Sequence, residues 1–280
     1  MEVAKHYPVE IVSVDSAQVY RHMDIGTAKP DTATLASVPH HLIDLIDPSE
    51  RYSAAQFRSD ALETMQQITK RGNIPLLIGG TMLYFRALFD GLSALPAADE
   101  AMRMKIDSEA KVIGWPAMHM KLNTLDPITA ARLKPTDSQR IQRALEICQL
   151  ANKPMSALLD QPNDADLPFQ ITNLALIPSD RKALHFRIAN RFDAMLKAGL
   201  ITEVRSIREQ FNVNADTPAM RCVGYRQVLM FLNNEIKQPE IREMGIAATR
   251  QLAKRQLTWL RGMKNNEVNE FDCLADDLVM

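Results

Sequence analysis

Short apolar runs alternate with longer amphipathic stretches over the first 95 residues, and this alternation limits the fold more than any other feature. Strand-like runs occur at 9–15 (VEIVSVD), 40–47 (HHLIDLID) and 73–80 (NIPLLIGG). Between the last two, residues 53–72 carry apolar side chains at the 3-and-4 spacing of a helix, which Gly72 is expected to end. Strands that alternate with helices favour a mostly parallel sheet with helices on its faces, so the sequence predicts an α/β fold.

The remainder of the chain is predicted to be helical apart from one returning strand in 173–180 (NLALIPSD). Helical patterns alone continue from about 97 to 136, as expected for a helical insertion. From 182 onward helices are expected again, interrupted by a loop over 214–225. We therefore predict an α/β core formed by 1–96 and 137–280, with a small all-helical insertion domain at 97–136.

The charge distribution is compatible with a polyanionic partner. Net charge is only −1, but residues 181–264 hold 16 Lys and Arg against 7 Asp and Glu, whereas residues 1–180 hold 17 against 22. A basic block in a near-neutral chain is what a phosphate-binding face requires, although solvated Arg-bearing helices would have the same composition. Both interpretations stay open on charge alone.

Location and redox state follow from the apolar runs and the cysteines. The longest apolar runs, such as 74–79, fall far short of the roughly 20 residues that span a bilayer, and the N-terminus has no secretory pattern. We therefore expect no membrane contact and a cytoplasmic location. Three widely spaced cysteines argue against a disulfide framework or a zinc site and are expected to be reduced thiols: Cys148, Cys222 and Cys273.

Two strand ends carry residues with possible chemistry. Ligands of parallel sheets gather at the carboxyl ends of strands, where Asp15 and Ser16 follow the first strand. Asp15 could bind magnesium, accept a proton or cap the next turn. After the third strand, Gly79 and Gly80 allow close backbone approach, and Thr81 opens a helix whose free N–H groups suit an anion. A simple strand-to-helix turn would look the same.

Two helical segments carry groups that suit nucleic acid. In 139–143, Gln and Arg side chains form a donor-rich patch beside an inward-pointing Ile141. In 245–263 a helical wheel gathers three cations, Arg250, Lys254 and Arg261, and places Leu252, Trp259 and Met263 on the opposite, packing side. Solvated helix faces are the alternative in both cases. Aligned cations without interleaved acids favour a phosphate track in the second.

Six blocks together resemble the tRNA dimethylallyltransferase family from about residue 3 to 262. The resemblance implies a P-loop NTPase-like parallel sheet flanked by helices. It also implies transfer of a dimethylallyl group from dimethylallyl diphosphate to N6 of the adenosine just 3′ of the anticodon. The partner would be the tRNA anticodon stem-loop, bound with that adenosine flipped out, and the enzyme would be a monomer. The blocks are SVDSAQVYRHMDIGTAKP, VPHHLIDLIDPSERYSAAQF, LLIGGTMLYFRALFDGL, DSQRIQRALEI, MRCVGYRQV and GIAATRQLAKRQLTWLR.

The resemblance also implies residue roles. Asp15 matches the family's catalytic carboxylate, taken as the general base for the adenine amino group, and Arg191 matches an Arg that grips the diphosphate. The insertion at 97–136 matches a small domain that closes on the anticodon stem. Positions implied to contact tRNA are Asp15, Ser16, Ala17, Gln18, Thr81, Arg103, Gln139, Arg140, Ile141, Gln142, Arg143, Arg221, Cys222, Val223, Gly224, Tyr225 and Arg226, to which the phosphate track adds Arg250, Lys254 and Arg261.

One departure from the family pattern concerns the diphosphate and Mg²⁺. Family members have a phosphate-binding loop of the type G-x-T-x-S-G-K-[ST], but the first glycine here is Gly26 and no glycine is followed by Lys. The resemblance implies Mg²⁺ as cofactor, and the missing loop would have supplied its hydroxyl ligand, so no metal ligand can be named. We therefore expect exposed sheet edges and impaired transfer through N-terminal truncation. The alternatives are a non-catalytic tRNA-binding protein and a prenyltransferase acting on free adenine nucleotides.

Overall fold

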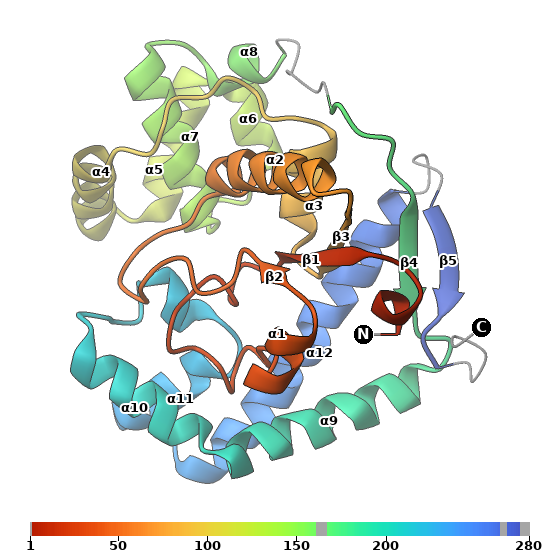
Figure 1. Cartoon of the computed structure of the whole chain (residues 1–280). Coiled ribbons are helices and arrows are strands. Elements are labelled where there is room, and N and C mark those ends of the chain that lie inside the picture. Colours follow the sequence, from red (N-terminus) through yellow and green to blue (C-terminus); the bar gives the residue numbers. More distant parts are fainter. Residues whose placement is uncertain (1, 161–166, 264–267, 275–280) are drawn as a thin grey trace. The chain divides into compact units, whose positions relative to one another are not determined.

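The computed structural model describes residues 2–160, 167–263 and 268–274 (Figure 1). The chain divides into two compact units, one formed by Met1–Ala87 with Pro168–Met280 and the other by Leu88–Leu167. The first unit contains all described strands, which form a three-stranded and a two-stranded parallel sheet, and the second is helical. The predicted α/β fold is confirmed. No helix in the described ranges is long and apolar enough to cross a membrane.

The three-stranded sheet has the order β2-β1-β3, with β1 at Val9–Val14, β2 at His40–His41 and β3 at Ile74–Gly79. All six residues of β1 are buried, as expected for the central strand of a parallel sheet. The register pairs Val9 with Ile74 and Val14 with Gly79, so β1 and β3 end at the same level. This alignment brings the residues that follow the two strands together.

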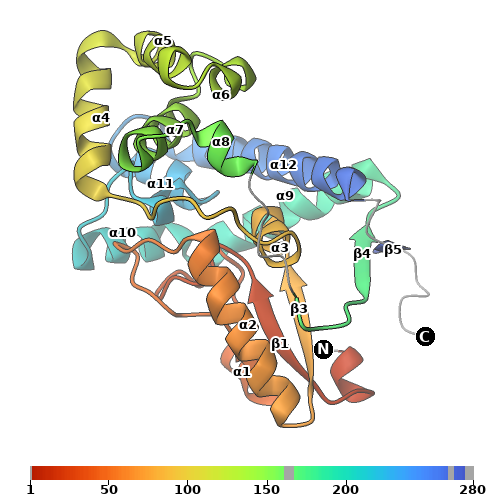
Figure 2. The same cartoon turned by 90° about the horizontal axis from the view of Figure 1, so that it is seen from above.

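Helix α2, at Ala54–Lys70, packs on β1 and β3 (Figure 2). A capping box between Ser53 and Gln56 satisfies free N–H groups at its start, and Gly72, with φ of +81°, ends it in the left-handed region. Its buried side chains are those that the sequence spacing predicted: Phe57, Ala61, Met65 and Ile68.

The predicted strand at 40–47 is wrong beyond its first two residues. Only His40 and His41 pair with β1, because Leu42 and Asp44 have φ of +61° and +53° and turn the chain out of the sheet. The segment then returns to the core, where Ile46 forms an isolated bridge with Tyr20. The apolar pattern therefore reflects a partly buried loop, and strand pairing is replaced by contacts with the segment after β1.

A second sheet pairs β4, at Asn173–Ile177, with β5, at Val268–Asp272. Strand β4 was predicted, whereas β5 lies in the acidic tail and has no strand pattern of its own. Apolar residues on β3 and β4 are exposed: Ile74 is 49%, Ile78 48%, Leu174 59% and Leu176 60% exposed. Exposed edge surface was expected, and these residues provide it.

The helices after residue 180 form a core with the segment that follows β1. Helices α9 (Arg181–Ala198) and α12 (Gln238–Gly262) pack together, as do α10 (Leu200–Gln210) and α11 (Tyr225–Leu232) (Figure 1). Tyr20 and Met23 are buried in the same cluster as Phe192 and Tyr225. A Cβ on Gly245 would lie 1.9 Å from Phe192, so the contact of α12 with α9 depends on this glycine. Short elements complete the first unit: η1 (Val3–Lys5), α1 (Thr32–Ser37), η2 (Pro218–Arg221) and most of α3 (Met82–Phe89).

The helical unit consists of α4 (Glu100–Ile113), α5 (Trp115–Leu125), α6 (Pro127–Arg132), α7 (Ser138–Ala151) and α8 (Met155–Leu159). Its buried Asp126 caps α6 through Thr129 and also accepts hydrogen bonds from the N–H and hydroxyl of Ser156, both at 2.8 Å. This unit is wider than the predicted insertion at 97–136, because α7 packs against α4 and α5 and shares their core. The segment 139–143 therefore belongs to the helical unit.

Candidate functional site

The ends of β1 and β3 meet at the predicted site. The backbone N–H of Ser16 donates a 3.0 Å hydrogen bond to Thr81 Oγ1, and the N–H of Thr81 donates to the carbonyl of Val14 at 3.1 Å. A Cβ on Gly79 would lie 2.1 Å from the Val14 carbonyl oxygen, so only glycine permits this approach. The structure thus brings together two blocks that the sequence separately indicated.

Asp15 fills one of the roles that the sequence left open, and the others stay predictions. Its Oδ1 accepts hydrogen bonds from the N–H groups of Ala17 at 2.7 Å and Gln18 at 3.3 Å, which is the capping role. Its Oδ2 makes no hydrogen bond with the part of the chain that the structure describes. The side chain is half-buried. The turn therefore fixes the carboxylate while leaving one oxygen able to accept a proton.

The charge of Asp15 helps to raise the pKa values of neighbouring side chains. Burial first, and then the charge of Asp15, raises the pKa of Cys222 to about 12, so this thiol is a neutral packing group. Burial, followed by the charges of neighbouring groups that include Asp15, also raises the pKa of Tyr84. Tyr84 stacks on Phe57 at a centroid distance of 4.3 Å. Sequence reasoning did not single out Tyr84. Its position on the first turn after Thr81 could have indicated that it lies near the site.

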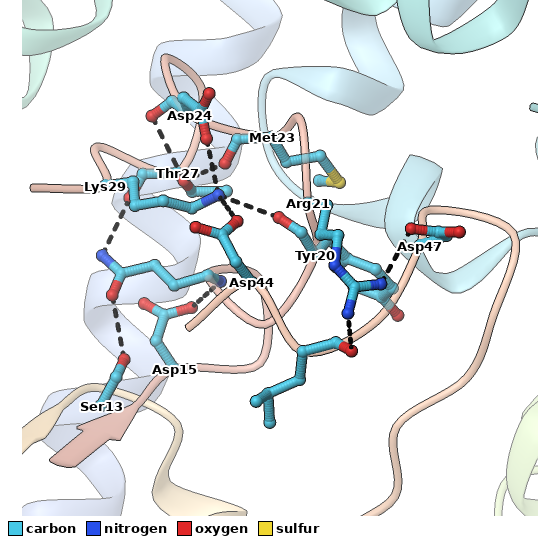
Figure 3. Close-up of polar contacts among 12 residues, drawn as sticks. Ser13, Asp15, Tyr20, Arg21, Met23, Asp24, Thr27, Lys29, Asp44 and Asp47 are labelled. Carbon is cyan, nitrogen blue, oxygen red and sulfur yellow. Dashed lines mark hydrogen bonds and ion pairs between the residues drawn. The ribbon is translucent and has the colours of Figure 1, made fainter. Parts of the chain in front are cut away.

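The segment after Asp15 is held by its own polar contacts (Figure 3). Gln18 accepts a 2.9 Å hydrogen bond from the Ser13 hydroxyl and lies within 3.5 Å of the Thr27 carbonyl. Lys29, only 4% exposed, donates to the Tyr20 carbonyl at 3.0 Å and pairs with Asp24 at 2.6 Å and Asp44 at 2.5 Å. Lys29 therefore ties the loop together, and its charge is already balanced by two carboxylates.

The segment 221–226 does not present all of its side chains to solvent. Tyr225 is fully buried and its hydroxyl donates a 2.6 Å hydrogen bond to Glu203, so its side chain is not exposed to an RNA, and the contact of 221–226 with tRNA stays a prediction. Gly224 is also buried, whereas Arg226 is exposed and Arg221 pairs with exposed Asp216 at 3.2 Å. Tyr225 instead packs in the hydrophobic core, where its volume supports the loop at Gly26.

Exposed cations of the first unit lie on α9 and α12. Arg191, Arg250, Lys254 and Arg261 are exposed, and none pairs with another residue in the described ranges. The predicted packing of Leu252 and Trp259 is wrong, because these side chains are 38% and 37% exposed. The face of α12 that turns inward there carries Gln256 instead, which donates to the Gly80 carbonyl at 3.0 Å.

In the helical unit, two of the predicted tRNA contacts belong to a buried ion-pair cluster. Glu146 is fully buried and accepts from Arg103 Nε at 2.9 Å, from Arg143 Nη1 at 2.7 Å and from the N–H of Asp99 at 2.8 Å. Burial alone would raise the pKa of Glu146, but these hydrogen bonds outweigh it and lower the pKa. Sequence reasoning missed Glu146, which is one charge on an otherwise apolar helix face.

The other residues of 139–143 differ in exposure. Ile141 is fully buried in the core of the helical unit, as its inward-pointing position predicted, and the contact of 139–143 with tRNA stays a prediction. Gln139 and Arg140 are exposed, with Arg140 pairing to the helix cap Asp137 at 2.7 Å. Gln142 donates to Asp107 at 2.6 Å.

Comparison with known proteins decides the family. The model of the IPP transferase family matches residues 18–263, which is most of the chain. The chain belongs to this family. Among its relatives, the tRNA dimethylallyltransferase of Nitrosomonas eutropha is 63% identical over 99% of this chain and 87% of its own length. The corresponding enzyme of Nitrosospira multiformis is 60% identical over 99% of this chain and 85% of its own.

Solved structures of the family agree in fold. The tRNA isopentenylpyrophosphate transferase of Bacillus halodurans matches with a TM-score of 0.66 and 35% identity, over 96% of this chain and 83% of that one. A eukaryotic dimethylallyltransferase that acts on tRNA matches with a TM-score of 0.79 and 26% identity, over 97% and 69%. The IPP transferase fold therefore extends over nearly the whole chain.

Proposed function

We propose that this chain transfers a dimethylallyl group from dimethylallyl diphosphate to N6 of the adenosine just 3′ of the anticodon in tRNA. Its membership of the IPP transferase family and relatives of 55–63% identity named tRNA dimethylallyltransferase support the reaction class. The observation that carries the assignment to a site is Asp15, whose Oδ2 is unpaired within the described residues at the end of β1.

Asp15 acts as the general base. The amino group of adenine is a weak nucleophile because its lone pair is conjugated with the ring. As N6 attacks C1 of the dimethylallyl group, the C1–O bond to the diphosphate breaks and the N6 proton moves to Asp15 Oδ2. A carboxylate in hydrogen-bond reach contributes roughly 10²- to 10⁴-fold to such a step. The Oδ1 contacts to Ala17 and Gln18 keep the accepting oxygen oriented.

Exposed cations neutralise the two anionic substrates. Arg191 is a candidate for binding the diphosphate, where a guanidinium would stabilise the charge that develops on the departing oxygen. Arg250, Lys254 and Arg261 would bind RNA phosphates and add salt-dependent affinity. Arg140 and Gln139 would add contacts from the helical unit, whereas Arg103 and Arg143 already share Glu146.

In this proposal Mg²⁺ would be bound to the diphosphate and has no assigned protein ligand. Within residues 2–160, 167–263 and 268–274, no group of three or more His, Cys, Asp and Glu side chains could hold a metal ion. Every step above is carried by Asp15 and the cations.

Transfer of label from dimethylallyl diphosphate into an anticodon stem-loop RNA tests the proposal. We expect label in a stem-loop with adenosine at the target position. A stem-loop with inosine there is the matched control, because inosine lacks the amino group, and it should stay unlabelled.

Three other outcomes would contradict the proposal. Stem-loop binding without transfer would support a non-catalytic tRNA-binding protein. Labelling of free AMP in preference to the stem-loop would support a nucleotide prenyltransferase. Equal labelling of the inosine stem-loop would exclude N6 as the acceptor.

A further inference from the structure

Glu203 on α10 binds the loop at 24–26 with both carboxylate oxygens. Its Oε2 accepts hydrogen bonds from the N–H groups of Asp24 at 3.0 Å and Ile25 at 2.7 Å. Its Oε1 accepts from the N–H of Gly26 at 3.2 Å and from the Tyr225 hydroxyl at 2.6 Å. Three consecutive N–H groups thus converge on one carboxylate, which is typical of an anion held in a backbone nest.

The same loop is also closely packed against side chains. Tyr225 is fully buried, and a Cβ on Gly26 would lie 2.4 Å from its ring and 2.8 Å from Leu200. Burial first, and then the Glu203 charge and hydrogen bond, raises the pKa of Tyr225, so its hydroxyl stays protonated and keeps donating. The loop is therefore held both by hydrogen bonds and by close packing.

From this loop a continuous polar path leads to Asp15. The Thr27 hydroxyl donates to the Met23 carbonyl at 2.6 Å, and Lys29 joins Asp24 to Asp44 (Figure 3). The Thr27 carbonyl lies within 3.5 Å of the Gln18 amide, and the N–H of Gln18 donates to Asp15 Oδ1. Contacts at 3.5 Å and 3.3 Å thus connect residues 24–27 through Gln18 with the turn that orients the base, so we expect displacement of 24–26 to loosen that turn.

We infer that Glu203 is a positioning residue for prenyl transfer, acting through the loop at 24–26 on the turn that holds Asp15. The inference rests on the proposed function, because it assigns Glu203 to the orientation of the proposed base. Glu203 itself lies on α10 and has no hydrogen bond or ion pair in the described ranges with Asp15 or with the cations proposed to bind phosphate. A misplacement of the order of 1 Å in a reacting group can cost about 10²-fold in rate.

The test compares Glu203→Ala, Glu203→Gln and Glu209→Gln with the wild-type chain. Glu209 lies on the same helix, is exposed and contacts none of these groups, so it is the matched control. Amide hydrogen exchange reports on Asp24, Ile25 and Gly26, while steady-state transfer gives kcat and the KM for the prenyl donor.

In Glu203→Ala we expect the three amides to exchange at least about tenfold faster and kcat to fall at least about tenfold, with the donor KM within about twofold of wild type. Glu203→Gln keeps one acceptor oxygen and should lie between Ala and wild type, whereas Glu209→Gln should match wild type. If the variants only lost their fold, the active fraction would fall, but exchange and kcat would not follow the order wild type, Glu203→Gln, Glu203→Ala.

Unchanged exchange in Glu203→Ala would overturn the inference, and so would fast exchange with unchanged kcat, since the loop would then be held without consequence for the reaction. Absence of transfer by the wild-type chain would instead contradict the proposed function. In that case the positioning role is tested by amide exchange and by the affinity of Glu203→Ala for the stem-loop, compared with wild type. Fast exchange with an affinity equal to wild type would overturn the positioning role. Fast exchange with a weaker affinity would support it.

Discussion

The backbone N–H of Ser16 donates a 3.0 Å hydrogen bond to the hydroxyl of Thr81, which joins the turn after β1 to the start of α3 across 65 residues of sequence. The Thr81 hydroxyl also lies 3.3 Å from the Ser16 hydroxyl. Since Ser16 follows Asp15 directly, this bond limits the position of the proposed base from the side of β3.

Replacing Thr81 by Val should therefore lower the rate of transfer more than it lowers stability. Valine keeps the shape but leaves the exposed Ser16 N–H to water, which costs about 1 kcal/mol of unfolding free energy, whereas kcat should fall roughly tenfold. Thr81→Ser keeps the hydroxyl and should retain most activity. Equal rates for the Val and Ser variants would show that the hydrogen bond does not orient Asp15.

Asp15→Asn should remove the base and preserve the turn. The Asn carbonyl oxygen can still accept from Ala17 and Gln18, so the melting temperature should stay close to wild type, while transfer should fall by roughly 10²- to 10⁴-fold. Asp31→Asn is the matched control, because Asp31 likewise accepts from a backbone N–H, that of Thr34 at 2.8 Å, as the N-cap of α1. A variant Asp15→Asn that transfers at the wild-type rate would exclude Asp15 as the base.

The buried Glu10 in β1 should make stability depend on acid pH. A two-pronged ion pair from Arg71 is the largest cause that lowers the pKa of Glu10, to about 2, helped by hydrogen bonds from Asn73 and His41. A lowered folded-state pKa contributes stability that is present above the unfolded value near 4.5 and is lost as pH falls toward 2. The full contribution is on the order of 3 kcal/mol.

Urea unfolding between pH 2 and 7 checks this expectation with Glu10→Gln. The difference in unfolding free energy between wild type and variant should be largest at pH 7 and should shrink as pH falls from about 5 to 2. Glu63→Gln, at an exposed position on α2, is the control and should show no such trend. A constant difference across the range would mean that the charge of Glu10 is not what stabilises the sheet.

Substitutions of Arg103 and Arg140 should distinguish a structural role from an RNA-binding role in the helical unit. Arg103→Ala removes two hydrogen bonds to the buried carboxylate of Glu146 and should destabilise by about 1.5–3 kcal/mol. Arg140 is 74% exposed in its pair with Asp137, and Arg140→Ala should cost less than about 1 kcal/mol. Thermal melts and stem-loop anisotropy measure both effects; only Arg140→Ala should weaken binding without lowering stability.

Removing a cation of α12 should reduce the salt dependence of RNA binding. Lys254→Gln should reduce the slope of log affinity against log salt by about 1, because one phosphate contact is lost. Lys70→Gln, at the exposed end of α2, provides the control and should leave the slope unchanged. If both variants have the wild-type slope, the phosphate track does not include Lys254.

Local patterns were enough to predict α2 and β1. The spacing of Phe57, Ala61, Met65 and Ile68 predicted α2, and the apolar run at 9–14 predicted a buried central strand, because burial of a helix face or a strand is recorded in adjacent residues. The pairing of β5 with β4 and the short extent of β2 were not predictable in this way, since both depend on partners far away in the sequence.

The candidate site also has parts that the sequence predicts and parts that it does not. The sequence by itself determined that a carboxylate ends β1, that Thr81 follows β3 and that cations gather on α12, since each of these is a property of a single segment. Only the tertiary structure decided that Lys29 is neutralised by Asp24 and Asp44, that Tyr225 is buried against the loop at Gly26, and that Glu203 collects three of its N–H groups. The physical reason is that burial and charge balance depend on neighbours from distant segments, which no local pattern records.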